Sequence, residues 1–134
     1  MYKYDIRSDE WEDTNRPMRV TRSWHSCLLL NKEILVVGGY LEKTTEIFNL
    51  QNRTWRSGPE LPKEIYSSQL VKAEPSSQYA AFLIGGKEDE DTISDIIAVT
   101  KDLKSFIKIG ELKTARQSHL AMLLSDEIVE KCVD

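Results

Sequence analysis

The chain is poor in the side chains on which most enzymatic and metal chemistry depends. Its 134 residues include only two cysteines, Cys27 and Cys132, and two histidines, His25 and His119. No CxxC pair and no cluster of cysteine with histidine occurs, so a zinc site has no support. An HExxH motif, a Ser/His/Asp arrangement and a phosphate-binding glycine loop are absent too. We therefore expect no metal ion, no cofactor and no catalytic residue, and we interpret Cys27 as a small buried apolar residue.

The sequence also lacks a long apolar run and an excess of basic residues. Its apolar segments, such as 27–30 and 34–37, are far shorter than the roughly 20 residues that a membrane-spanning helix needs. No apolar run follows the first residues, so we expect no signal peptide. We therefore expect the thiols to be reduced and the location to be cytoplasmic. The net charge is −4, whereas nucleic-acid-binding domains usually have a pI above about 9. Neither a membrane nor a nucleic acid is an expected partner.

Sustained helical periodicity is missing as well, and the chain contains instead short apolar segments rich in Val, Ile, Leu and Tyr. Turn-forming or charged residues end each segment within a few positions, which is typical of strands joined by turns. We expect an all-β protein. The predicted strands cover residues 2–6, 10–13, 26–30, 33–38, 45–49, 54–57, 68–72, 79–84, 95–100, 105–109, 118–124 and 127–133.

These strands recur in groups of four with a period of roughly forty to fifty residues, which indicates one supersecondary unit used repeatedly. A glycine pair follows the second strand of each complete unit, at Gly38-Gly39 and Gly85-Gly86. Glycine accepts positive φ and lets a neighbouring group approach the backbone closely, so we expect a tightly packed corner at each pair. An aromatic residue in the fourth strand, Trp55 or Phe106, is the expected filler of that corner.

The unit divides the chain into four parts. We predict a half unit at 1–17, whole units at 18–60 and 61–111, and a second half unit at 112–134. The first half would supply a third and a fourth strand, and the last half a first and a second strand. The two ends are therefore complementary in strand content.

Other positions repeat in phase with the glycine pairs. Arg-x-x-His precedes a first strand at Arg22–His25 and again at Arg116–His119, and the third strands carry Tyr4-Asp5 and Phe48-Asn49. Together these features resemble the kelch repeat over nearly the whole chain. The resemblance implies a partial kelch-type β-propeller built of four-stranded antiparallel blades. It also implies structural roles for the repeat residues Gly38, Gly39, Trp55, Gly85, Gly86, Phe106, Trp11, His25 and His119.

The resemblance is incomplete in two places. Ile65 and Ser68 stand in the second repeat where Arg22 and His25 stand in the first, and the segment 126–132 is not followed by a glycine pair. Similar propellers commonly have about six blades. One interpretation is therefore a piece of a longer propeller protein. The other is a homodimer, in which the half units of two chains meet and complete a ring.

The resemblance further implies which surface binds. In similar propellers the loops from second to third strand and from fourth to first strand share one face, which grips short peptide segments of partner proteins through arginines. The candidate binding residues on that face are Arg16, Arg19, Arg22, Tyr40, Tyr66 and Arg116. Arginine suits carboxylates, so the expected partner is an acidic protein or peptide. Alternatives remain: packing for Arg22 and Arg116, solvated surface for Arg16 and Arg19, and either a solvated tip or a docking site for a basic partner at 88–91.

The expected function is protein–protein interaction. Many proteins with similar repeats present substrates to ubiquitin ligases, so we predict the substrate-recognition part of a ubiquitin-ligase adaptor. The alternatives are an actin-associated or cytoskeletal scaffold and a fragment that closes no ring. We do not expect an enzyme, because His25 and His119 lie at equivalent strand starts and would be spread around a ring rather than gathered at its axis.

Overall fold

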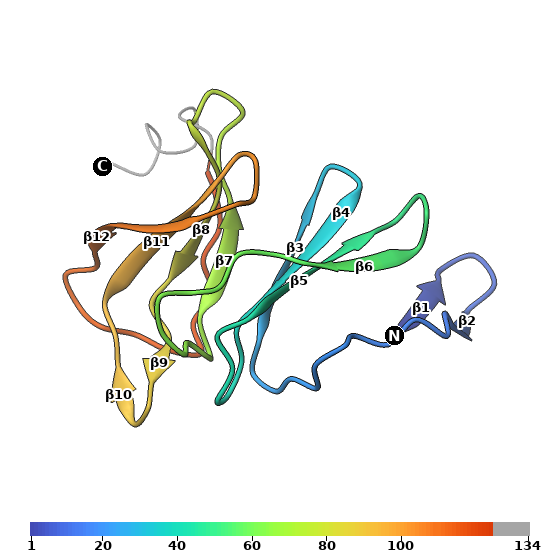
Figure 1. Cartoon of the computed structure of the whole chain (residues 1–134), viewed down its shortest axis with the longest axis horizontal. Coiled ribbons are helices and arrows are strands. Elements are labelled where there is room, and N and C mark those ends of the chain that lie inside the picture. Colours follow the sequence, from blue (N-terminus) through green and yellow to red (C-terminus); the bar gives the residue numbers. More distant parts are fainter. Residues whose placement is uncertain (125–134) are drawn as a thin grey trace.

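The computed structural model describes residues 1–124, which contain twelve strands and no helix (Figure 1). In this part of the chain there is accordingly no helix long and apolar enough to cross a membrane. The strands are β1 (Tyr2–Asp5), β2 (Glu10–Asp13), β3 (Ser26–Leu30), β4 (Glu33–Val37), β5 (Thr45–Asn49), β6 (Thr54–Ser57), β7 (Gln69–Lys72), β8 (Tyr79–Ile84), β9 (Lys87–Glu88), β10 (Asp91–Thr92), β11 (Asp95–Thr100) and β12 (Phe106–Glu111). The prediction of an all-β protein is confirmed.

Eight of these strands form two four-stranded antiparallel sheets. The first sheet has the order β3-β4-β5-β6 and the second the order β7-β8-β11-β12, so each is an up-and-down meander. Figure 1 shows the two sheets side by side, with their first strands β3 and β7 adjacent. At that junction the Ser26 hydroxyl donates a hydrogen bond to the Ser68 carbonyl oxygen at 2.6 Å. This is the arrangement of consecutive blades in a partial β-propeller.

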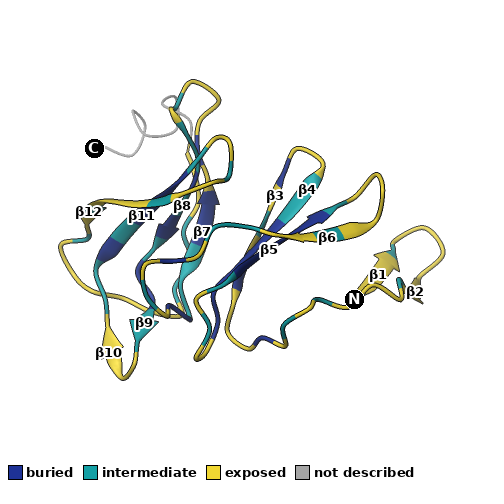
Figure 2. Cartoon of the chain, in the orientation of Figure 1, coloured by how far each residue is buried: buried dark blue, intermediate teal, exposed yellow. Residues whose placement is uncertain are grey.

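The hydrophobic core lies between the two sheets. Side chains alternate along a strand, so one face of the first sheet contributes Leu35, Val37 and Ile47, and the facing side of the second contributes Leu83 and Ile97. Each of these five side chains is at most 2% exposed. Figure 2 shows buried residues concentrated on inner strands of the two sheets, among them β5 and β11. Burying such a side chain contributes about 1.5–3 kcal/mol. The contact between the two blades therefore supplies stability that neither sheet has alone.

Both glycine pairs form the tight corners that the sequence predicts. Gly38 and Gly85 have φ of 62° and 55°. A Cβ added to Gly38 would lie 2.4 Å from the Ile65 carbonyl oxygen, and one added to Gly85 would lie 2.4 Å from the Arg116 carbonyl oxygen. No side chain fits there, so glycine is required by both the backbone angle and the space.

The group that packs against each glycine pair is not the one we predicted. The fourth-strand aromatic was expected there, but Trp55 packs on Phe48, with ring centroids 4.9 Å apart. The corner is instead closed by main chain of the following repeat, since the Gly39 N–H donates to the Ile65 carbonyl oxygen at 3.0 Å. The reason is register: Trp55 is paired with Phe48 on the face of the first sheet that points away from the second.

The N-terminal residues form a separate two-stranded hairpin, β1 with β2. Tyr4 and Trp11 pack on each other with centroids 5.0 Å apart, but Trp11 is 70% exposed. On the outer face of the first sheet, Cys27 is exposed. Our interpretation of Cys27 as a buried residue is therefore wrong, because β3 turns that side chain away from the core between the blades.

The structure corrects the predicted strands at the C-terminal side. Residues 118–124 form no strand, and Leu120 and Met122 are 76% and 64% exposed there. A strand needs a hydrogen-bonding neighbour, which the described residues do not supply. The last predicted strand, 127–133, and Cys132 lie outside the described residues. Conversely, the short hairpin of β9 and β10 was not predicted, because two-residue strands carry no periodic pattern.

Candidate interaction surface on the loop face

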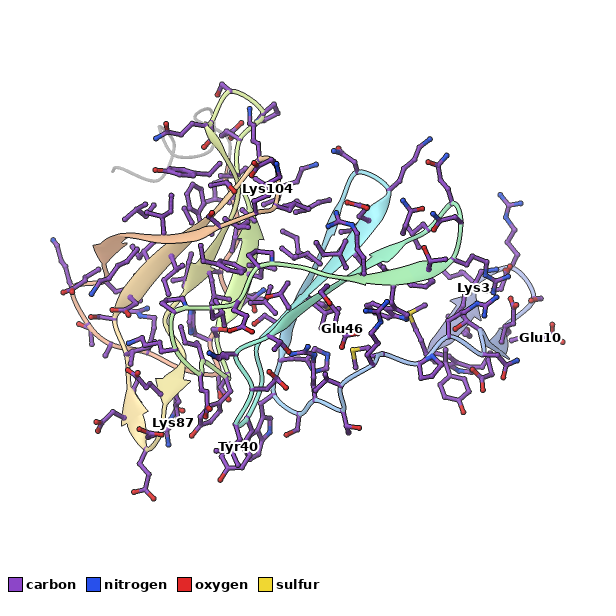
Figure 3. The ribbon with its side chains drawn as sticks, in the orientation of Figure 1. Lys3, Glu10, Tyr40, Glu46, Lys87 and Lys104 are labelled. Atoms are coloured by element: carbon purple, nitrogen blue, oxygen red, sulfur yellow. The ribbon has the colours of Figure 1, made fainter. Side chains whose placement is uncertain are left out.

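Four loops of the two blades converge at one end of the sheets, which we name the loop face. Figure 3 labels Tyr40, from the loop between β4 and β5, and Lys87, from the connection between β8 and β11, and both lie at this end. The segments that precede β3 and β7 also reach it. The Tyr40 N–H donates to the Ser23 carbonyl oxygen at 2.9 Å, and the Lys87 N–H donates to the Tyr66 carbonyl oxygen at 2.8 Å. The same bond thus recurs at equivalent positions of both repeats.

Three aromatic rings meet on the loop face and form what we call the aromatic corner. The rings of Trp24 and Tyr66 stack at 5.8 Å with an interplanar angle of 27°, and Tyr40 meets both edge-on. Tyr66 is only 7% exposed, whereas Trp24 and Tyr40 are 62% and 48% exposed. A hollow of about 750 Å³ lies against the corner. The charged side chains that line it are Glu64, Lys87, Asp89 and Glu90.

Tyr66 is the fixed wall of this corner. Its hydroxyl donates to the Asp89 carbonyl oxygen, and its N–H donates to the Lys87 carbonyl oxygen at 3.1 Å. The segment 87–92 is held as a hairpin by pairing of Lys87 with Thr92 and of Glu88 with Asp91. The acidic run at 88–91 is therefore an ordered part of the surface.

Trp24 has an unusual backbone, with φ of 53°. The left-handed region costs an ordinary L-residue roughly 1–2 kcal/mol, and bulky residues occupy it rarely. The equivalent residues of the next two repeats, Ser67 and Ser118, have φ of 52° and 47°. A main-chain ladder connects them: the Ser67 N–H donates to the Trp24 carbonyl oxygen at 2.9 Å, and the Ser118 N–H to the Ser67 carbonyl oxygen at 2.8 Å. The scaffold thus imposes this conformation on the equivalent residue of each repeat, and that residue is serine in two of the three.

Trp24 lies inside the Arg-x-x-His segment and was not among the predicted binding residues. A signal for it was present: the equivalent positions hold Ser67 and Ser118, so the aromatic residue is peculiar to the first repeat. Tyr40 and Tyr66, by contrast, were both predicted, and the structure brings them together with centroids 5.3 Å apart.

Arg22 lies beneath the surface rather than on it. Its guanidinium donates to the carbonyl oxygens of Gly38 at 2.9 Å and Thr44 at 2.8 Å, and to the Thr44 hydroxyl at 2.8 Å. It also pairs with the Glu46 carboxylate at 3.3 Å, where the two side chains are 0% and 4% exposed. Glu46 in turn accepts from the Arg19 N–H at 2.8 Å. Arg22 therefore organises the loop that leads into β3 and has no free face for a ligand.

The other predicted arginines are exposed but do not meet at the hollow. Arg16 and Arg19 lie beside Trp55: the indole N–H donates to the Arg16 carbonyl oxygen at 3.0 Å, and the Arg19 guanidinium donates to the Trp55 carbonyl oxygen at 3.1 Å. Arg116 follows β12, and its carbonyl oxygen accepts from the Gly86 N–H at 2.8 Å. The three side chains are thus distributed over the chain and do not form a common arginine grip with Tyr40 and Tyr66.

A network of opposite charges braces the base of the acidic hairpin. Lys63 contacts Glu88 at 2.6 Å and Asp95 at 3.0 Å, and Lys108 contacts Asp95 at 2.8 Å. Burial alone would raise the pKa of Asp95, but hydrogen bonds from Lys108 and Lys63 hold that pKa below its ordinary value. Burial likewise opposes the charge of Lys63, yet its carboxylate partners raise the pKa of that ammonium group. The network keeps the hairpin in place beside Tyr66.

In a comparison with known protein families, the Kelch motif model matches residues 21–62. That segment contains the whole first sheet, the buried Arg22 and the glycine pair at Gly38-Gly39. The comparison with curated proteins gives no significant match. The chain thus carries a kelch motif, and its four-stranded antiparallel sheets are those of a partial kelch-type propeller. Kelch repeats generally mediate protein–protein binding.

Proposed function

We propose that the chain is a protein-interaction module that docks a peptide segment of a partner protein on the aromatic corner of its loop face. The observation that carries this proposal is the exposure of Trp24 and Tyr40, at 62% and 48%, against a fixed Tyr66. Tryptophan and tyrosine dominate the energetics of protein interfaces because they bury a large area at low entropic cost. A rigid wall with two open rings beside a hollow is suited to an extended segment.

The backbone of Trp24 supports the same proposal. The left-handed conformation at this position is satisfied by Ser67 and Ser118 in the other repeats, so the fold does not need an indole there. A bulky residue at an unfavourable backbone angle is more readily explained by what its side chain contacts. Here the exposed ring of Trp24 contacts Tyr40 and Tyr66 and otherwise faces solvent.

A selection from a library of displayed random peptides tests the proposal, with the unchanged chain as bait. The selected peptides are then measured against Trp24→Ser, which keeps the residue that the scaffold already accepts at this backbone position. We expect at least about a tenfold loss of affinity, the effect of removing an interface tryptophan. Trp11→Ser, which removes another exposed tryptophan, is the control. Peptides that bind both variants as well as the parent would refute docking at the aromatic corner.

The adaptor role is a narrower proposal. We infer from the resemblance of the repeats that the module recognises substrates for a ubiquitin ligase. Proximity labelling in cells tests this: a cullin-type ligase should be labelled by the unchanged chain, and its absence would remove the adaptor role without affecting peptide docking. The cytoskeletal alternative, the cytoplasmic location and the lack of enzymatic activity stay predictions of the sequence.

We also propose that two copies of the chain associate through the outer faces of their sheets. The outer face of the first sheet has an apolar hollow of about 480 Å³ lined by Met18, Val20, Ile34, Val36 and Trp55. The outermost strand of the second sheet exposes Ile107 and Ile109, at 45% and 43%. In a propeller both outer faces contact neighbouring blades, and a second copy would offer each of them another apolar outer face.

A further inference from the structure

We propose that the segment docked on the aromatic corner is basic, with an arginine or lysine side chain lying against Trp24 and Tyr40 and its charge facing Glu64, Asp89 and Glu90. This inference rests on the proposed function, because it names the chemistry of the partner at the same site. It differs from the acidic peptide that the arginine pattern of the sequence predicts.

The charge that lines the hollow favours a cation. Three carboxylates, Glu64, Asp89 and Glu90, stand against a single ammonium group, Lys87. The whole chain is acidic too, with a net charge of −4. The net charge of the chain and the carboxylates at the hollow therefore both attract a basic partner.

The carboxylates of the hollow are free to take up this role. Within residues 1–124, the side chains of Glu64, Asp89 and Glu90 take part in no ion pair, although the neighbouring Glu88 is bound by Lys63. All three are exposed residues. The Asp89 main chain, by contrast, is fixed by the Tyr66 hydroxyl. The hairpin thus offers unpaired charge from a backbone that is already ordered.

The arginines that would attract an acidic partner are not available at the hollow. Arg22 is buried and bonded to Glu46, while Arg16 and Arg19 lie beside Trp55. None of the three lines the hollow. An acidic segment on the aromatic corner would therefore meet repulsion from the hairpin without a compensating guanidinium group.

The aromatic rings supply the second half of the recognition. A guanidinium or ammonium group over a tryptophan or tyrosine ring is attracted by the ring's negative face, and arginine can also stack flat on it. Such a contact occurs within the described residues, since the Lys87 ammonium lies 5.9 Å from the centroid of the Tyr66 ring. The Tyr66 ring is thus already in contact with Lys87, whereas the exposed rings of Trp24 and Tyr40 can accept a cation of the partner.

Matched peptides test the inference with the full chain. Three short labelled peptides share a glycine-serine backbone and carry arginine, its uncharged isostere citrulline, or glutamate at the same positions. Fluorescence anisotropy should show saturable binding of the arginine peptide, with affinity at least about tenfold weaker for citrulline and no binding of glutamate. Added salt should weaken the arginine complex, because the exposed carboxylates are screened.

Variants of the chain assign the effect to the hollow. Asp89→Asn combined with Glu90→Gln should weaken the arginine peptide about tenfold. The control pair, Glu10→Gln with Glu74→Gln, removes the same charge from exposed residues outside the hollow and should change affinity less than about twofold. Equal losses in both pairs would overturn the inference, because they would show attraction to net charge alone.

The outcomes separate this inference from the proposed function. Binding of the glutamate peptide that is lost in Trp24→Ser would overturn the basic partner and leave the docking site in place. Absence of measurable binding by all three peptides would also overturn the inference. If peptides selected from the random library depend on Trp24 but show no enrichment in arginine or lysine, the site is a docking surface and the basic chemistry is wrong.

Discussion

Replacement of Arg22 by alanine is the sharpest test of how the loop face is built. The side chain is 0% exposed and pairs with Glu46, which is 4% exposed, at 3.3 Å. Arg22→Ala would leave the Glu46 carboxylate buried without its cation, and would remove the donor from the Gly38 and Thr44 carbonyl oxygens. Breaking one partner of a buried ion pair costs about 3–5 kcal/mol.

The lower end of that range applies here. Glu46 keeps two main-chain donors, the N–H groups of Arg19 at 2.8 Å and Val20 at 3.1 Å. We therefore expect a loss of about 3 kcal/mol, which is a large part of the roughly 5–15 kcal/mol that stabilises a small domain. With a urea dependence of about 2 kcal/mol per molar, the unfolding midpoint should fall by about 1.5 M.

The control is Arg16→Ala, since the side chain of Arg16 is exposed and should change the free energy of unfolding by less than about 0.5 kcal/mol. A second variant identifies the cause: adding Glu46→Gln to Arg22→Ala removes the uncompensated charge and should recover about 1 kcal/mol or more. An Arg22→Ala midpoint equal to that of the parent would refute the structural role. So would normal folding with a selective loss of peptide binding, which would return Arg22 to the binding residues.

Three other predictions address the corners, the histidines and the assembly. Gly85→Ala should destabilise the chain by about 1–3 kcal/mol, because its Cβ would meet the Arg116 carbonyl oxygen at a positive φ, whereas Gly110→Ala, with nothing within 4 Å, should change unfolding little. Burial, and secondly Arg116, lowers the pKa of His119 below 6.5. The unfolded chain then binds more protons than the folded chain, so the contribution of His119 to the free energy of unfolding is fully present above about pH 6.5 and is lost as pH drops through the folded-state pKa. The free energy of unfolding of His119→Gln should therefore depend less on pH over that range. An unchanged pH dependence would contradict the lowered pKa. Light scattering over a dilution series should show a dimer that dissociates in Ile107→Glu, which changes a residue that is 45% exposed, and a monomer at every concentration would remove the association of outer faces.

Most strands could be predicted from the sequence because each is a short apolar segment ended by turn residues. The segments 26–30, 45–49, 54–57, 79–84 and 95–100 have the predicted bounds in the structure. The glycine corners were predictable for a local reason, since positive φ is a property of a residue and its neighbours. The strand predicted at 118–124 was wrong because pairing depends on a partner elsewhere in the chain, and no local pattern specifies one.

The candidate site was less predictable, because it depends on which side of the chain a residue faces. Arg16, Arg19 and Arg22 lie close together in sequence and were expected to form one grip. The structure buries Arg22 against Glu46, whereas the main chain of Arg16 and the guanidinium of Arg19 contact Trp55. Ile65 replaces Arg22 in the second repeat and is 1% exposed, so an apolar side chain fills the equivalent position.

The equivalence of repeats explains where recognition can vary without loss of the fold. Trp24, Ser67 and Ser118 share one backbone conformation and one main-chain ladder. Tyr40 and Lys87 follow the two glycine pairs, and each donates the same hydrogen bond to the preceding loop. Since the main chain makes the contacts that hold the blades together at these positions, the side chains are free to differ. The aromatic corner arises because the first repeat places Trp24 and Tyr40 beside Tyr66 of the second, so the binding surface belongs to the junction of two repeats rather than to either one.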